Sequence, residues 1–250
     1  MCTGIKLIDM KWNNYKFRSS GVGNIVSKSG KLTQGVKTYV AQKRLEKLKD
    51  FRIEITSKYF EKGNLTEQAG LAMLNRCLYP GTFLHKNTKS ESNDYITGTC
   101  DAITPDGIVY DIKNAWDWET FRKAELTHNY EWQLKAYCWL YGKPHGRLMY
   151  CLNDMPDEMI DDEERKLFYA KKFPPIDHPE YDEARAELER RYKYDNYSDW
   201  ERFKIWDVPL LPGDIDRIKS AVEAAREYMS QLDEEEEQRI LINKSLVYNE

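Results

Sequence analysis

Two aspartates and a lysine stand close together in the middle of the chain, on segments that predict a β-hairpin. Asp101 precedes a Pro105-Asp106-Gly107 turn, and Asp111-Ile112-Lys113 follows it. Side chains alternate between the faces of a strand, so Asp111 and Lys113 point one way and Ile112 points into a core. Asp101 then faces Asp111 across the hairpin. Buried carboxylates repel unless a cation joins them, which predicts a divalent metal with oxygen ligands and metal-dependent hydrolysis of phosphodiesters.

The elements around this hairpin predict an α/β (α+β) chain with a central mixed sheet flanked by helices. Residues 95–103 and 108–114 form the hairpin strands, and the aliphatic pattern predicts further strands at 146–152 and, as an edge strand, at 203–210. Apolar residues at helical spacing predict helices at 35–48, 57–78, 128–141 and 213–232.

A glutamate on the helix before the hairpin is a further candidate ligand. Glu67 lies between Gly63 and Gly70, and glycine inside a helix costs about 1 kcal/mol relative to alanine. A close approach of another backbone beside Glu67 would explain such glycines. The plainer alternative is an ordinary exposed helical glutamate.

Gln133 and Tyr137 lie four residues apart, on one face of the helix that follows the hairpin. Their polar ends could contact a backbone phosphate or orient a water molecule. A half-buried tyrosine in a core is the ordinary alternative for such a pair.

Positive charge is concentrated in the first quarter of the chain. Residues 1–66 contain 14 Lys and Arg against 5 Asp and Glu, whereas the whole chain has a net charge of -4. A basic sector in an otherwise acidic protein is typical of a surface that binds a polyanion such as DNA. A solvated helix surface is the alternative interpretation.

In order and spacing, these motifs resemble those of the PD-(D/E)XK nuclease superfamily, and most closely its RecB-like and lambda-exonuclease (YqaJ) branch. The matching motifs are Gly63 to Glu67, Gly98 to Asp101, Asp111 to Lys113 and Gln133 to Tyr137. The resemblance covers roughly residues 15–150 and implies a restriction-endonuclease-like core.

The resemblance also implies a role for each residue. Glu67, Asp101, Asp111 and the backbone carbonyl of Ile112 would hold one or two Mg²⁺ or Mn²⁺ ions. Lys113 would position or deprotonate the attacking water, or neutralise charge on the phosphate. Gln133 and Tyr137 complete the implied catalytic set.

The implied DNA-binding residues lie near the start of the chain. In lambda-type exonucleases a short Arg/Ser segment holds the 5′ phosphate, and the nearest counterpart here contains Arg18 and Ser20, although a plain loop is the alternative. The lysines expected to contact DNA are Lys28, Lys31 and Lys37. For the aromatic residues after the second strand, base stacking competes with core packing, which we expect for at least two of Trp116, Trp118 and Phe121.

Five scattered cysteines without a C-x-x-C pair argue against structural zinc. The iron-sulfur members of the RecB-like branch need three cysteines after the core, and no cysteine follows Cys151, so we expect no iron-sulfur cluster. No Walker-type phosphate loop is present either.

We expect one nuclease domain over residues 1–250. Its core would comprise about 15–153 and 201–232, with a helical arm or insertion at about 154–200 and a solvated acidic tail segment at 233–237. No stretch is apolar enough to span a membrane, and the charged start does not resemble a signal peptide, so we expect no membrane association and a cytoplasmic location in a bacterial or phage-infected cell.

The activity expected from these residues is that of a Mg²⁺-dependent DNA exonuclease acting from duplex ends, 5′ to 3′, in phage-type recombination. The resemblance implies a single-strand annealing protein as a partner and a homotrimer as the assembly. Two alternatives stay open: an endonuclease of the same superfamily, and a catalytically idle fold that binds only DNA or protein.

Overall fold

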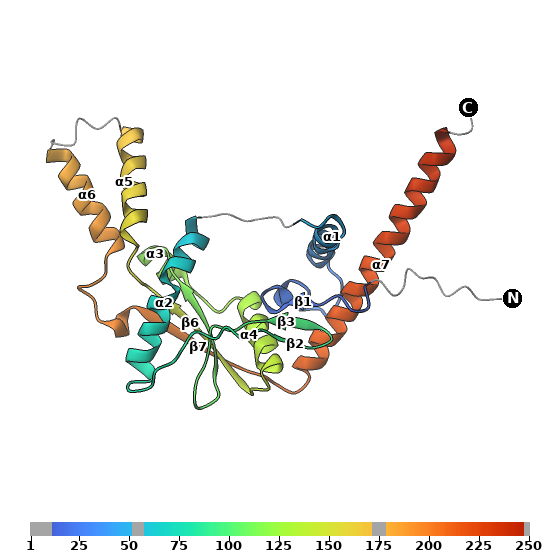
Figure 1. Ribbon diagram of the computed structural model, residues 1–250, viewed down its shortest axis with the longest axis horizontal. Helices are drawn as coiled ribbons and strands as arrows, with labels where there is room; N and C mark the ends of the chain where they lie inside the picture. The colour runs from blue at the N-terminus through green and yellow to red at the C-terminus, as the bar shows by residue number, and fades with distance from the viewer. Residues whose placement is uncertain (1–11, 52–57, 172–178, 248–250) are drawn as a thin grey trace.

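The computed structural model describes residues 12–51, 58–171 and 179–247. The charged start of the chain, which we expect not to be a signal peptide, lies outside the described residues. Two mixed sheets and the helices packed on them form the central body of the molecule (Figure 1). Helices α5 (Asp157–Lys171) and α6 (Pro179–Tyr192) project from one side of this body, and α7 (Asp214–Val247) projects from the other. The molecule is therefore concave between two projections. No described helix is both long and apolar enough to cross a bilayer.

The sheet that contains Asp111 and Lys113 has the order β4-β5-β6-β7. Strands β5 and β6 are parallel, whereas β4 and β7 run antiparallel to their neighbours, and β7 is an edge strand as expected. The strand bounds are β4 (Ala102–Ile103), β5 (Val109–Asn114), β6 (His145–Cys151) and β7 (Phe203–Pro209).

A second, smaller sheet has the order β1-β3-β2, formed by β1 (Phe17–Arg18), β2 (Glu91–Ser92) and β3 (Ile96–Gly98). The expected continuous strand at 95–103 is thus wrong, because the chain leaves this sheet after Gly98 and enters the other at Ala102. The mixed α/β architecture with flanking helices is confirmed.

The turn between β4 and β5 forms as the sequence predicts. The backbone N–H of Gly107 donates to the carbonyl of Thr104 at 2.8 Å, and Gly107 has φ +83°. Glycine adopts this left-handed conformation without steric cost, so the turn places β5 antiparallel to β4.

Hydrogen-bonding caps define the starts of two helices near the site. The side chain of Thr33 accepts from the backbone N–H of Val36 at the start of α1, and Thr127 accepts from Tyr130 at the start of α4. The remaining helix bounds are α1 (Gln34–Lys49), α2 (Lys58–Leu78), α3 (Trp118–Lys123) and α4 (His128–Leu140), with short 3₁₀ helices η2 (Ser19–Asn24) and η3 (Asp199–Glu201).

Helix α2 packs closely on β5 because Gly70 has no side chain. A Cβ atom at this position would lie 2.7 Å from Cγ2 of Ile112. Leu71 and Leu74 bury the same face of the helix against Ile112. The close contact at Gly70 is thus made with side chains and not with another backbone, and at Gly63 a Cβ would meet nothing within 4 Å.

The amino-terminal part of α2 is tied to the central strands by a buried lysine. Lys62 is 1% exposed, and its ammonium donates to the carbonyls of Ala115 and Trp116, both at 2.9 Å, and of Asn153 at 3.0 Å. These carbonyls follow the ends of β5 and β6. Lys62 therefore holds three segments together and does not belong to the basic surface that the charge distribution predicted.

The acidic segment 233–237 lies within α7, where Glu235 and Glu237 are exposed as expected but Asp233 is buried. Asp233 is 6% exposed and accepts from Nε1 of Trp12 at 2.9 Å and from Nε of Arg44 at 2.6 Å. Glu236 accepts from the same guanidinium at 2.6 Å. These bonds fasten α7 to α1, and they occupy Arg44, which the charge distribution had suggested as part of a basic surface.

Helices α5 and α6 form the arm and pack on each other beside the catalytic sheet. Their contact is apolar and includes Met159, Ile160 and Leu188, with Trp116 of the adjoining loop in the same cluster. Ion pairs of Arg185 with Glu164 and Asp161 join the two helices.

Candidate active site

Asp101 lies at the entry to β4 and is fixed by the backbone of β5. Its N–H donates to the carbonyl of Tyr110 at 3.1 Å, and its Oδ2 accepts from the N–H of Ile112 at 2.5 Å. Asp101 therefore faces Asp111 across the β4–β5 pair, which is the arrangement that strand alternation predicted.

Asp111 is the buried centre of the cluster, with 1% of its surface exposed. Its Oδ1 accepts from Nζ of Lys113 at 3.0 Å and from Nε2 of Gln133 at 2.9 Å. Its Oδ2 lies 2.9 Å from the same Nζ but without the alignment of a hydrogen bond, so this buried oxygen is unsatisfied. A buried oxygen in this condition is costly and favours an additional cation.

The two carboxylates change each other's electrostatics. Desolvation and the charge of Asp111 raise the pKa of Asp101 to about 7, against the smaller opposing effects of Lys113 and the N–H of Ile112. Desolvation lowers the pKa of Lys113, but Asp111 and Asp101 together raise it above the ordinary lysine value. The cluster therefore holds a charged lysine and a carboxyl group that changes protonation near neutral pH.

Gln133 and Tyr137 of α4 hold the carboxylate of Asp111 in position. Both side chains are buried, and Nε2 of Gln133 donates to Asp111 and to the hydroxyl of Tyr137 at 3.1 Å. Desolvation and Asp111 raise the pKa of Tyr137, so its hydroxyl stays protonated. This pair orients the carboxylate of Asp111, and neither member reaches the surface as a free phosphate ligand would.

Gly98 allows the Arg/Ser segment to pack close to Tyr137, the residue that binds Gln133. A Cβ on Gly98 would lie 2.9 Å from Cε1 of Tyr137 and closer still to the side chain of Ser19, whose Oγ donates to the carbonyl of Thr97 at 3.2 Å. The chain at Arg18 is thereby linked to the helix that orients Asp111.

Glu67 lies near enough to Asp101 to contribute to its raised pKa, but Nζ of Lys86 binds its Oε2 at 2.7 Å. Among the described residues, no three carboxylate, histidine or cysteine side chains lie close enough together to form a ready set of metal ligands. The structure thus brings Asp101 and Asp111 together directly and leaves Glu67 beside them in an ion pair.

The donor chemistry fits a divalent cation that prefers oxygen ligands. Two carboxylates face each other across the β4–β5 pair, one buried oxygen of Asp111 is unsatisfied, and desolvation and the charge of Asp111 raise the pKa of Asp101. Mg²⁺ and Mn²⁺ match such oxygens, and a cation would remove the repulsion between the carboxylates. Asp101 and Asp111 would hold it, with Glu67 available after release from Lys86.

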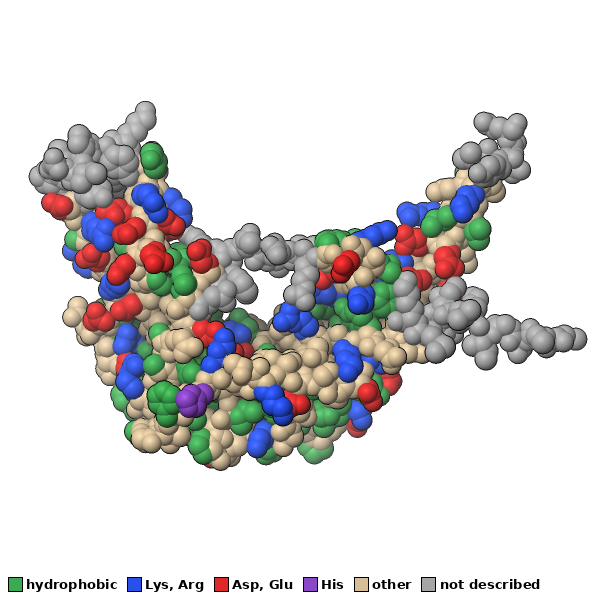
Figure 2. Space-filling view, viewed as in Figure 1, with side chains coloured by type: hydrophobic (Ala, Val, Ile, Leu, Met, Phe, Trp, Pro, Cys, Tyr) green, Lys and Arg blue, Asp and Glu red, His purple; other side chains and the backbone are tan. Residues whose placement is uncertain are grey.

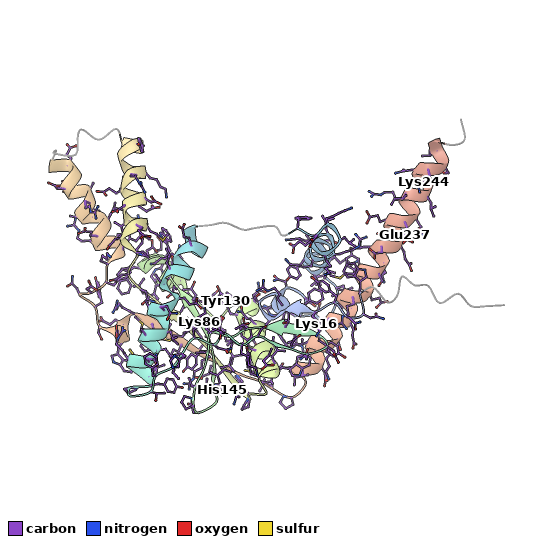
Figure 3. The ribbon with its side chains drawn as sticks, viewed as in Figure 1. Lys16, Lys86, Tyr130, His145, Glu237 and Lys244 are labelled. Atoms are coloured by element: carbon purple, nitrogen blue, oxygen red, sulfur yellow. The ribbon has the colours of Figure 1, made fainter. Side chains whose placement is uncertain are left out.

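A groove of about 680 Å³ between η2 and α1 contains the Arg/Ser segment. Arg18 and Ser20 are exposed there. Four basic and two acidic side chains line the groove, and Nζ of Lys43 pairs with Oε2 of Glu46 at 2.8 Å; the charged residues are Lys16, Arg18, Lys43, Lys47, Glu46 and Asp50. Figure 3 places Lys16 on this side of the concave face, with Tyr130 and Lys86 nearer the middle. In Figure 2, acidic side chains gather on the arm, while Lys and Arg side chains occur on the face between the arm and α1.

The predicted Lys28, Lys31 and Lys37 lie elsewhere. Lys28 and Lys31 are exposed on the loop before α1, and Nζ of Lys37 lies 5.4 Å from the ring centre of Tyr228 in α7. The cations that accompany Arg18 are instead Lys16, Lys43 and Lys47, and the i,i+4 spacing of Lys43 and Lys47 is the sequence signal that could have singled them out.

Core packing accounts for two of the three aromatic residues after β5. Trp116 and Phe121 are buried, at 5% and 6% exposure, and Trp118 is half-buried. The aromatic ring beside Lys113 belongs instead to Tyr130 on α4, with its centre 5.5 Å from Nζ of the lysine. Neither motif nor periodicity distinguished Tyr130.

Comparison with known proteins gives a consistent fold. A phage-related exonuclease from Haemophilus somnus 129PT superposes with a TM-score of 0.69 at 23% identity, over 89% of this chain and 96% of that one. An alkaline exonuclease from Laribacter hongkongensis gives 0.60 at 12% identity, over 92% and 97%. The chain has the fold of these exonucleases.

The complex of the Laribacter hongkongensis exonuclease with dAMP matches similarly, with a TM-score of 0.57 at 13% identity over 91% of this chain and 94% of that one. No protein-family model matches the chain, and no curated protein matches its sequence. The exonuclease fold agrees with the nuclease resemblance of the four motifs, and the superpositions cover about nine tenths of this chain.

Proposed function

We propose that this protein is a Mg²⁺- or Mn²⁺-dependent DNA exonuclease that degrades duplex DNA from its ends in the 5′ to 3′ direction. The observation that carries the proposal is the pair Asp101 and Asp111 beside Lys113, in which one buried carboxylate oxygen is unsatisfied. The exonuclease fold supports the same activity.

Each residue of the candidate site has a separate role in the proposed reaction. Asp101 loses its proton above a pKa of about 7 and then offers a second negative ligand beside Asp111. Gln133 keeps Oδ1 of Asp111 in place. A bound divalent cation would polarise the scissile phosphate and lower the pKa of a water molecule. The ammonium of Lys113 would stabilise the negative charge that develops on the phosphate.

The basic groove supports the choice of DNA ends. Arg18 presents a planar guanidinium, which suits bidentate binding of a terminal 5′ phosphate, and Lys16, Lys43 and Lys47 line the same groove. The link from Ser19 through Gly98 to Tyr137 places this groove next to the support of Asp111.

Incubation with Mg²⁺ and either linear or covalently closed circular duplex DNA tests the proposal. We expect degradation of the linear DNA alone, and no degradation by Asp111→Asn. Cutting of the circle would identify an endonuclease, and retained binding without cleavage of either form would identify an idle fold.

The direction and the role of Arg18 are tested with end-labelled duplexes. We expect faster digestion from 5′-phosphate than from 5′-hydroxyl ends, and loss of that preference in Arg18→Gln. Arg239→Gln, a change on the far part of α7 where the side chain is 70% exposed, is the control and should keep the preference. Equal rates on both ends for the wild type would contradict a 5′-phosphate site in the groove.

The assembly and partner follow from the family resemblance and are proposed on that basis. Sedimentation of the full chain should give a homotrimer, and co-purification with a single-strand annealing protein encoded nearby would support a recombination role. A monomer at micromolar concentration would contradict the proposed trimer without affecting the cleavage site.

A further inference from the structure

Lys86 is a cation of the candidate site that none of the sequence motifs contains. Its Nζ lies 2.7 Å from Oε2 of Glu67, with 43% of the lysine side chain and 29% of the glutamate side chain exposed. Figure 3 shows Lys86 in the middle of the view, between α2 and α4. The ion pair joins α2 to the loop between α2 and β2.

The backbone beside Lys86 is fixed to the catalytic strands. The N–H of Asn87 donates to the carbonyl of Asp101 at 2.8 Å, and Nδ2 of Asn87 donates to the carbonyl of Cys100 at 3.2 Å and to the hydroxyl of Tyr141 at 3.0 Å. The hydrogen bonds of Asn87 therefore fix the backbone of Lys86 at the edge of the carboxylate cluster. This fixed backbone keeps the lysine side chain within reach of Glu67.

The lysines match the carboxylates of the cluster. Nζ of Lys113 lies 2.9 Å from Oδ2 of Asp111, and Nζ of Lys86 lies 2.7 Å from Oε2 of Glu67. Two of the three carboxylates of the cluster are thus already paired with a lysine. A divalent ion that takes Glu67 as a ligand competes directly with the ammonium of Lys86.

We infer that Lys86 is a phosphate-binding residue whose ammonium is held in an ion pair with Glu67 (the storage step) and is released when a divalent cation binds (the release step). The inference rests on the proposed function of the site. Once Glu67 turns to the cation, the ammonium of Lys86 loses its partner at the edge of the site. A DNA phosphate is the anion that the proposed substrate would bring there, and lysine binds phosphate as a compact charge.

Metal binding measured by calorimetry with Mn²⁺ tests the storage step. Because Lys86 competes for Glu67, Lys86→Met should bind Mn²⁺ about two- to fivefold more tightly than the wild type, as expected for the loss of an exposed ion pair. The matched control is Lys89→Met, since Lys89 lies on the same loop, pairs with Glu91 and is 78% exposed. The control should bind Mn²⁺ as the wild type does.

A double-mutant cycle shows whether the effect passes through Glu67. In a Glu67→Gln background, Lys86→Met should bring no further gain in Mn²⁺ affinity, because the carboxylate that it competes for is absent. An equal gain in both backgrounds would mean that Lys86 acts only through its general charge, and the storage step would be overturned.

DNA binding measured with and without Ca²⁺ tests the release step. With Ca²⁺, Lys86→Met should weaken DNA binding and lower the slope of log affinity against log salt by about one contact. Without divalent ions, the variant and the wild type should bind equally, because Lys86 is occupied by Glu67. The same loss under both conditions would overturn the inference.

The two proposals fail in different ways. If the wild type neither binds Mn²⁺ nor cleaves DNA, the proposed function is wrong. If the wild type does both and Lys86→Met behaves as Lys89→Met does, only the inference about Lys86 is wrong.

Discussion

Two lysines of the same sheet region have opposite surroundings. Lys62 donates to three neutral backbone carbonyls after the ends of β5 and β6, and desolvation lowers its pKa to about 8 in spite of Asp117 and Asp154. Lys113 on β5 contacts the carboxylate of Asp111, and its pKa is raised above the ordinary value. Burial lowers the pKa of both lysines, and the adjacent carboxylates of Lys113 overcome that effect, whereas those near Lys62 do not.

We call Lys62 the structural lysine, because it joins three segments, and Lys113 the chemical lysine, because we propose that it takes part in the reaction. Carbonyl dipoles stabilise an ammonium less than a carboxylate does, so the ammonium of Lys62 joins three segments while its pKa lies below the ordinary lysine value. Lys113 has a dependable charge at the place where a phosphate would meet the carboxylates. The four predictions below test this division, beginning with the largest expected effect.

Removal of the chemical lysine should stop the reaction. Lys113→Met should lower the cleavage rate at least about a hundredfold, because the ammonium that stabilises the phosphate is lost. Single-turnover digestion of linear DNA measures the effect, and circular dichroism should show an unchanged helix content. Lys123→Met, at a lysine that is 62% exposed and paired with Glu119, is the control. Near wild-type cleavage by Lys113→Met would refute the chemical role.

Removal of the structural lysine should act on stability instead. Lys62→Met leaves three carbonyls without their donor and should lower the free energy of unfolding by about 2 to 4 kcal/mol, measured by urea denaturation. The folded variant should still cleave DNA. A variant as stable as Lys123→Met would show that the three hydrogen bonds contribute nothing.

The support of Asp111 should have an intermediate effect on catalysis. Gln133→Leu removes a donor to Oδ1 of Asp111 while Lys113 stays, and residues that orient a ligand in this way typically affect activity about 10- to 100-fold. We expect kcat to fall with unchanged DNA affinity. The exposed Gln68 provides the control, Gln68→Leu. A change in DNA affinity alone would mean that Gln133 contacts DNA.

The pH dependence of stability should reveal the lowered pKa of Lys62. Between a folded pKa of about 8 and the ordinary value of 10.5, the unfolded chain holds a proton that the folded chain has released, so stability rises with pH. The stability of the wild type relative to Lys62→Met should therefore increase by about 1 to 2 kcal/mol between pH 7.5 and 9.5. A constant difference would show that the carbonyls retain the proton.

Local patterns were sufficient for much of the site. The alternation of a strand puts Asp111 and Lys113 on one face, and one helical turn separates Gln133 from Tyr137, so sequence spacing translates directly into geometry. The helices near the site were predictable for the same reason. Caps such as Thr33 and Thr127 are local signals that need no knowledge of the fold.

Features that depend on distant neighbours could not be predicted in this way. Lys62 resembles every other lysine of a basic sector until three carbonyls from two strands surround it. Helix α7 continues beyond its apolar stripe because Arg44 and Trp12 bind Asp233. The split of the segment 95–103 likewise depends on which strand each half meets, a choice that the apolar pattern does not contain.

Gly70 sets the distance between α2 and β5 through the packing of the helix on the strand. Glu67 lies one helical turn before Gly70, and the missing methyl group at Gly70 lets α2 approach within contact distance of Ile112. The position of Glu67 relative to the aspartates is thus set by helix-to-strand packing and not by the length of its own side chain. A graded series of small residues at position 70 would therefore move Glu67 away from the aspartates in steps set by the added side-chain volume, without any change to the charged residues.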